Sequence, residues 1–217
     1  MSEQKRLPEY CIWDFNGTLL DDVDTGIRAV NDLLRERALP TVGSREEYQA
    51  VFGFPIRGYY ERLGFDFEKE SYETVAPLWV ARYLRYVKTA PLFEDVRRTL
   101  EYFRERGVRQ IVLSATERDM LLAQLKELGI IDYFEEIFGL DNIHAASKVA
   151  LAHAWRERHA DAKAIMIGDT DHDVATAEQM GAECILIARG HQSAERLSAL
   201  GRPIYLSLDE MIRQRFS

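Results

Sequence analysis

The stretch YCIWDFNGTLL, residues 10–20, places a short apolar run directly before an acid and a turn. Tyr10 to Trp13 has the length and the apolar content of a buried strand. Asp14 ends this run, and Asn16-Gly17 is a residue pair typical of turns. The stretch therefore predicts a strand that carries an acidic side chain at its carboxyl end and is followed by a chain reversal.

The next 70 residues, 21–90, contain no strand-like run. Apolar residues recur at helical spacing over about 21–37, and a further helix is expected over 68–87, interrupted or kinked near Pro77. Between these two helices, glycines and prolines break the chain, and 52–60 is expected to form a loop. We therefore expect 21–90 to be a helical insertion.

From residue 91 onward, segments of helical and strand character alternate. The expected strands cover 108–114, 137–138, 164–168, 184–187 and 204–206, and the expected helices cover 94–106, 117–128, a segment capped by Ser147 that runs to about 158, a segment that ends at Met180, and a short terminal segment. Such alternation predicts a parallel sheet with helices on both faces. The predicted fold class is α/β, with a Rossmann-like three-layer parallel-sheet core formed by 1–20 and 91–217 and a helical cap, 21–90, inserted after the first strand.

Three polar residues lie at the carboxyl ends of expected strands: Asp14, Ser114 and Asp169. In sheets of this kind, ligands bind beyond the carboxyl ends of the strands. Because the strands are parallel, these ends meet at one edge, so we expect the three side chains to converge on one crevice.

Composition excludes several classes of function. The chain of 217 residues has a formal net charge of −8 and no basic tract, which argues against a nucleic-acid partner. No apolar run approaches the roughly 20 residues needed to cross a bilayer, and residues 1–8 do not resemble a signal peptide, so we expect a cytoplasmic protein with no membrane partner.

Cys11 and Cys184 lie in apolar strands, where we expect buried, inert thiols. The five histidines lack the paired spacing of a zinc site.

The run Asp14-Phe15-Asn16-Gly17-Thr18-Leu19-Leu20 resembles the first motif of the haloacid dehalogenase superfamily. Three further elements follow in the expected order: Ser114 after a strand, Lys148 at a helix start, and the acid-rich run 168–173 after another strand. The resemblance covers nearly the whole chain, with 21–90 in the place of the cap, and the general fold resembles phosphoglycolate phosphatases. It implies a phosphatase that acts on a small phosphorylated metabolite.

The resemblance also assigns roles at the site. Asp14 is the expected nucleophile, which forms an aspartyl phosphate. The expected cofactor is Mg²⁺, held by Asp14, by the backbone carbonyl of Asn16 and by Asp169, while Asp173 holds a metal-bound water. Lys148 is expected to neutralise charge shared by Asp14 and the phosphoryl group.

Other residues are expected to bind the substrate. By the same resemblance, the phosphoryl oxygens accept hydrogen bonds from hydroxyl or backbone N–H groups at Gly17, Thr18, Ser114 and Ala115. Arg57, in the 52–60 segment that we expect to enter the site, is a candidate for binding a carboxylate or a second phosphate. A solvated arginine in a loop within the cap is an equally good interpretation. Asp171 and His172 stay outside the predicted catalytic set.

Asn16 departs from the family pattern, in which phosphatases carry an aspartate that acts as general acid and base. A carboxamide has no proton to exchange near neutral pH, and loss of such a group typically costs about 10²–10⁴ in rate. The sequence leaves three outcomes open: a phosphatase that is slow or takes good leaving groups such as acyl or aryl phosphates, a phosphoenzyme that hydrolyses slowly, or a phosphoester-binding pseudo-phosphatase or regulatory protein with little turnover. We expect a monomer or homodimer.

Overall fold

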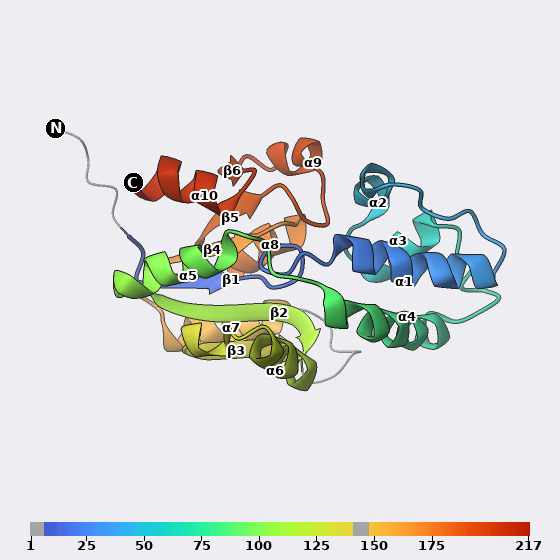
Figure 1. The fold of residues 1–217 in the computed structure, drawn as a ribbon, viewed down its shortest axis with the longest axis horizontal. Helices are drawn as coiled ribbons and strands as arrows, with labels where there is room; N and C mark the ends of the chain where they lie inside the picture. Colours follow the sequence, from blue (N-terminus) through green and yellow to red (C-terminus); the bar gives the residue numbers. More distant parts are fainter. Residues whose placement is uncertain (1–6, 141–147) are drawn as a thin grey trace.

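The computed structural model describes residues 7–140 and 148–217. Within them lies a six-stranded parallel sheet in the order β3-β2-β1-β4-β5-β6 (Figure 1). The strands are β1 (Tyr10–Trp13), β2 (Arg109–Glu117), β3 (Glu136–Leu140), β4 (Ala164–Gly168), β5 (Glu183–Ile187) and β6 (Ile204–Tyr205). The predicted α/β parallel-sheet class is confirmed. The first strand lies in the middle of the sheet, between β2 and β4.

Helices cover both faces of the sheet because successive strand residues point to opposite sides. Cys11 and Trp13 pack in one buried cluster with α5 (Val96–Glu105), α6 (Arg118–Glu127) and α10 (Leu208–Met211). Tyr10 and Ile12 pack in another with α7 (Lys148–Arg158), α8 (Asp171–Met180) and α9 (Ala194–Ser198). Cys11 and Cys184 are both buried, as expected.

The segment between β1 and α5 forms a helical unit of its own. It consists of α1 (Val23–Glu36), α2 (Arg45–Val51), α3 (Ile56–Arg62), α4 (Tyr72–Tyr86) and the 3₁₀ turn η1 (Val87–Thr89), which we call the inserted helices. They lie to one side of the sheet (Figure 1) and share a separate buried cluster, in which α1 packs on α4. The first strand therefore leads directly from the sheet into this unit.

The structure differs from the sequence prediction in the inserted helices. The stretch 52–60, expected as a loop, contains the start of α3, which begins at Ile56 after Pro55 at its N-cap. Proline is tolerated there because the first turn of a helix leaves its N–H groups unpaired. The helix α2 was not expected either; Ser44 caps it by accepting a hydrogen bond from the backbone N–H of Glu47.

The predicted cap at Ser147 lies outside the described residues, and α7 begins at Lys148. Across residues 7–140 and 148–217, no helix has both the length and the apolar character of a bilayer span.

Candidate active site

Three carboxylates meet at the carboxyl edge of the sheet. Asp14 follows β1, Asp169 follows the neighbouring strand β4, and Asp173 lies in the first turn of α8. All three are buried, and one oxygen of each lies within 4.8 Å of the others. Asp14 and Asp169 lie close together, as expected, because β1 and β4 pair in parallel and end at the same edge of the sheet.

The Asp173 carboxylate is held by the start of α8. Its Oδ2 accepts hydrogen bonds from the backbone N–H groups of Asp169 and Thr170, at 3.2 and 3.0 Å, and from the Thr170 hydroxyl at 2.7 Å. Its Oδ1 accepts from Nζ of Lys148 at 2.9 Å. Burial alone would raise the pKa of Asp173, but Lys148 and Thr170 keep it below its ordinary value. This carboxylate is therefore fixed and ionised.

Lys148 joins two of the carboxylates. Its Nζ contacts Oδ1 of Asp14 as well as Asp173, and its side chain is buried. Burial disfavours the ammonium form, yet the two carboxylates raise the pKa of Lys148 above its ordinary value. The lysine therefore remains charged beside Asp14.

The cluster carries more negative charge than Lys148 balances. Burial raises the pKa of Asp14 well above its ordinary value, and Lys148 offsets this only in part because Asp173 and Asp169 repel the same charge. Burial also raises the pKa of Asp169 to about 6. Carboxylate oxygens are the ligands that Mg²⁺ takes in proteins, so the donor set fits a hard divalent cation.

Asn16 is enclosed by hydrogen bonds. Its Nδ2 donates to Oδ2 of Asp22 at 2.9 Å and to the Tyr83 hydroxyl at 2.7 Å, and its Oδ1 accepts from Oγ1 of Thr116 at 2.8 Å. The Tyr83 hydroxyl in turn donates to Asp22 at 2.7 Å. Because a carboxylate only accepts hydrogen bonds, Asp22 determines that the NH₂ side of the carboxamide faces it. The side chain of Asn16 is thus fixed in one orientation.

A buried ion pair that sequence reasoning missed adjoins Asn16. Nε2 of His191 lies 3.3 Å from Oδ1 of Asp22, which also accepts from the backbone N–H of Gly17 at 2.8 Å. Burial works against charge on His191, but Asp22, with Asp169, raises the pKa of His191 to about 9. Burial likewise works against the Asp22 carboxylate, but His191 keeps its pKa below the ordinary value. Nδ1 of the charged ring lies 2.9 Å from the Tyr48 hydroxyl of α2.

Of His191 and Asp22, only His191 has a place in the sequence that could have marked it as a site residue. His191 follows β5 by a few residues, so the rule that selected Asp14 and Asp169 at strand ends also applies to it. Its backbone N–H donates to Oδ2 of Asp169 at 2.6 Å. Asp22 precedes α1 and follows no strand directly, so nothing in the local pattern marked it.

The expected phosphoryl-binding residues lie next to the carboxylates. Oγ1 of Thr18 donates to Asp169 at 3.1 Å, and Oγ of buried Ser114 lies 3.4 Å from the carboxamide oxygen of Asn16. Gly17 has φ +75°, and a Cβ there would lie 2.3 Å from Oδ2 of Asp169, so only glycine fits. Ala115 lines the cavity described below.

Arg57 is not part of this group. Its Nε pairs with Glu61 at 3.1 Å, one helical turn along α3, and its guanidinium lies 5.0 Å from the centre of the Phe67 ring. Its exposed position supports the interpretation of Arg57 as a solvated arginine. Asp171 pairs with Arg196, outside the carboxylate cluster.

A cavity of about 240 Å³ lies between the carboxylate edge and the inserted helices. Asp14, Asn16, Lys148 and Asp169 line its sheet side. Its other side, which we call the roof, is largely aromatic and includes Tyr48, Phe52, Phe54, Tyr59, Tyr60 and Trp79.

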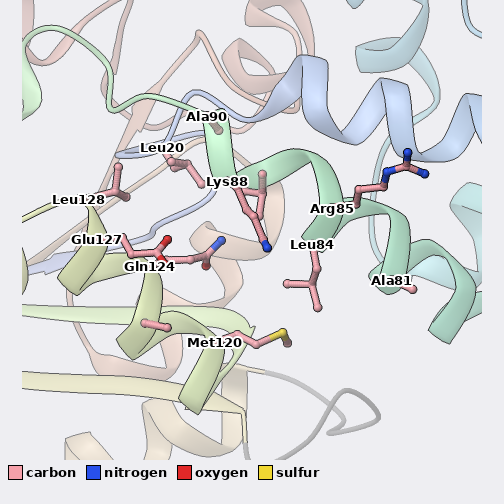
Figure 2. A pocket seen from close by; sticks show the side chains of 12 residues that line it. Leu20, Ala81, Leu84, Arg85, Lys88, Ala90, Met120, Gln124, Glu127 and Leu128 are labelled. Carbon is pink, nitrogen blue, oxygen red and sulfur yellow. The ribbon is translucent and has the colours of Figure 1, made fainter.

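A larger cavity, of about 620 Å³, lies between α4, η1 and α6 (Figure 2). Leu84, Met120 and Gln124 line both cavities, so these three side chains separate them. The larger cavity contains none of the clustered carboxylates. Only the smaller one places a ligand beside Asp14.

Comparison with known proteins agrees with this geometry. The model of the haloacid dehalogenase-like hydrolases matches residues 11–187. A phosphoglycolate phosphatase of Rhodobacter capsulatus is 25% identical over 185 residues, 83% of this chain and 84% of that protein. The tyrosine-protein kinase PtkA of Mycobacterium tuberculosis is 26% identical over 192 residues, 87% of this chain and 65% of that protein. A haloacid dehalogenase-like hydrolase structure from Streptococcus pneumoniae has a TM-score of 0.79 at 21% identity, covering 95% of this chain and 97% of its own, a likeness of fold alone.

Proposed function

This chain belongs to the haloacid dehalogenase-like hydrolases, and from that premise we propose that it is a magnesium-dependent phosphohydrolase of small phosphate esters with Asp14 as the nucleophile. The observation that carries the proposal is the position of Asp14, buried beside Lys148 and within 4.8 Å of two further carboxylates. The named relatives, a phosphatase and a protein kinase, both act on phosphoryl groups, which supports phosphoryl chemistry.

In the proposed reaction, Asp14 attacks phosphorus and the ester oxygen leaves with the bonding electrons. Lys148 neutralises charge on Asp14 and on the phosphoryl group, and Asp173 keeps that ammonium in place. Mg²⁺, held by Asp14 and Asp169, supplies charge neutralisation for the anionic ester. Water then attacks the phosphorus of the aspartyl phosphate, which releases inorganic phosphate and restores Asp14. The inserted helices, as a cap, exclude bulk water from these groups.

A second candidate function is a phosphoester-binding protein with little turnover. The observation that favours it is the hydrogen-bonded carboxamide of Asn16, which occupies the acid–base position and cannot transfer a proton. The buried cluster of Asp14, Lys148, Asp169 and Asp173 favours the hydrolase, because a binding protein needs no nucleophile beside its cation site.

Phosphate release from a panel of monoesters and acyl phosphates, with and without Mg²⁺, tests the proposal. We expect magnesium-dependent turnover that is lost in Asp14→Ala. Asp161→Ala, an exposed change of the same kind, serves as the control and keeps the wild-type rate. Absence of turnover across the panel, together with magnesium-dependent ligand binding, would instead support the binding protein.

A further inference from the structure

The roof of the smaller cavity has the character of a binding site for an aromatic ring. Phe52 stacks on Tyr48 with centroids 5.2 Å apart, and Trp79 stacks on Tyr83 at 5.0 Å, so the rings hold one another in place. An apolar cavity of about 150 Å³ is large enough to bind benzene. At about 240 Å³, this cavity has room for one six-membered ring and a phosphoryl group at its sheet side.

The roof offers no cation to a second anionic group. Of the described residues that line the cavity, the basic ones are Lys148 and His191, and both are paired with buried carboxylates. The two arginines of α3 are directed elsewhere: Arg57 pairs with Glu61, and Arg62 donates to the backbone carbonyl of Val51. A substrate with a free carboxylate, such as phosphoglycolate, would have to bury that charge without a partner.

The lack of an acid at Asn16 favours a phosphate ester whose leaving group is a phenol. Without a general acid, the ester oxygen must leave as an anion, and this is easier for a phenol, whose pKa is about 10, than for an alkyl alcohol, whose pKa lies near that of water at about 16. The aromatic roof, which offers no free cation, and the missing proton donor thus point independently to a phenol as the leaving group.

We propose that the substrate is a monoaryl phosphate, the phosphate ester of a single aromatic ring with no further charge. This inference rests on the proposed function and narrows its substrate class. Asp14 forms the new P–O bond as the P–O(aryl) bond breaks, and the phenolate takes the electron pair and then a proton from water. Water next adds to phosphorus and the P–O(Asp14) bond breaks, with the released proton passing to phosphate and solvent.

Ligand binding tests the inference without turnover. With Mg²⁺ present, calorimetry should show phenylphosphonate binding at least tenfold more tightly than methylphosphonate, because only the former places a ring against the roof. Ala76→Leu, which adds volume at a lining position of α4, should weaken phenylphosphonate binding at least fivefold more than methylphosphonate binding. Ala50→Leu, an exposed change in α2, should leave both affinities unchanged.

Steady-state kinetics provide a second test of the inference. Phenyl phosphate should exceed 2-phosphoglycolate in kcat/KM by at least 100-fold, and it should exceed acetyl phosphate, which has a good leaving group but no ring, by at least tenfold. Equal binding of the two phosphonates, or acetyl phosphate turnover equal to that of phenyl phosphate, would overturn the ring-binding inference while leaving the hydrolase intact. Absence of all turnover with a retained phenylphosphonate preference would overturn the proposed hydrolase alone.

Discussion

The carboxamide nitrogen of Asn16 lies 2.9 Å from Oδ2 of Asp22. Asp22 is buried and ionised by its pairing with His191, so position 16 faces a fixed negative charge. An amide satisfies that charge by donating a hydrogen bond, whereas a second carboxylate would repel it. The residue at the acid–base position is therefore matched to its immediate neighbour.

Replacing Asn16 with aspartate should restore an acid. The neighbouring Asp22 raises the pKa of the new carboxyl, which keeps it protonated and able to donate to a leaving group. We expect turnover of alkyl phosphates to rise by about 10²–10⁴, with a smaller gain for phenyl phosphate, which needs less protonation. Steady-state kinetics of the variant and the wild type on both ester classes measure the two gains. Asn16→Ala is the control that lacks the acid. Equal gains for the two classes would contradict the assigned role.

The wild-type protein should show burst kinetics with p-nitrophenyl phosphate. The phenolate leaves without an acid, but Asn16 cannot deprotonate the water that attacks the aspartyl phosphate, so the second step is slower. Stopped-flow absorbance should record close to one p-nitrophenolate per Asp14 before a slower steady state. A linear trace from the first turnover would indicate that formation of the phosphoenzyme, and not its hydrolysis, limits the rate.

Magnesium should stabilise the fold through the carboxylate cluster. At 100 times its dissociation constant, a ligand adds about 2.7 kcal/mol, which for a protein of this size corresponds to a rise of about 5–10 °C in Tm. Asp169→Asn should remove most of this rise, because it deletes one of the three clustered carboxylates. Thermal denaturation with and without Mg²⁺ tests this, with exposed Asp161→Asn keeping the full response. An undiminished response in Asp169→Asn would place the cation elsewhere.

The ion pair of His191 with Asp22 should make metal-free stability depend on pH. Folding raises the pKa of His191 from its ordinary 6.5 to about 9, because Asp22 outweighs the effect of burial. The folded state thus binds the proton more tightly, so this stabilisation is complete below about pH 6.5 and is lost as pH rises through 9. In EDTA, the free energy of unfolding should fall more between pH 7 and 9 for wild type than for His191→Gln. Exposed His153→Gln should follow the wild-type curve.

Much of the site could be predicted from local sequence pattern. Asp14 and Asp169 each end an apolar strand, and parallel strands bring their carboxyl ends to one edge whatever the details of packing. Asp173 follows Asp169 by four residues and lies in the first turn of α8, close to the end of β4 that Asp169 follows. The family resemblance added Lys148, which the structure places against Asp14.

Other parts of the site arise from contacts between distant segments. Tyr83 reaches Asn16 across 67 residues, and Tyr48 reaches His191 across 143, because the inserted helices pack over the sheet edge. No periodicity in the sequence encodes that packing. Arg57, a reasonable anion ligand by sequence, is not among the residues that line the cavity and pairs with its helical neighbour Glu61.

Strand length, strand ends and motif order are local properties of the chain, so they were enough to predict the family, the parallel sheet and the edge at which the carboxylates meet. The surroundings of Asn16 and the residues of the roof depended instead on packing between segments that are distant in the sequence. Hydrogen bonds and aromatic contacts act over a few ångströms, so their partners were set by how the inserted helices pack against the sheet.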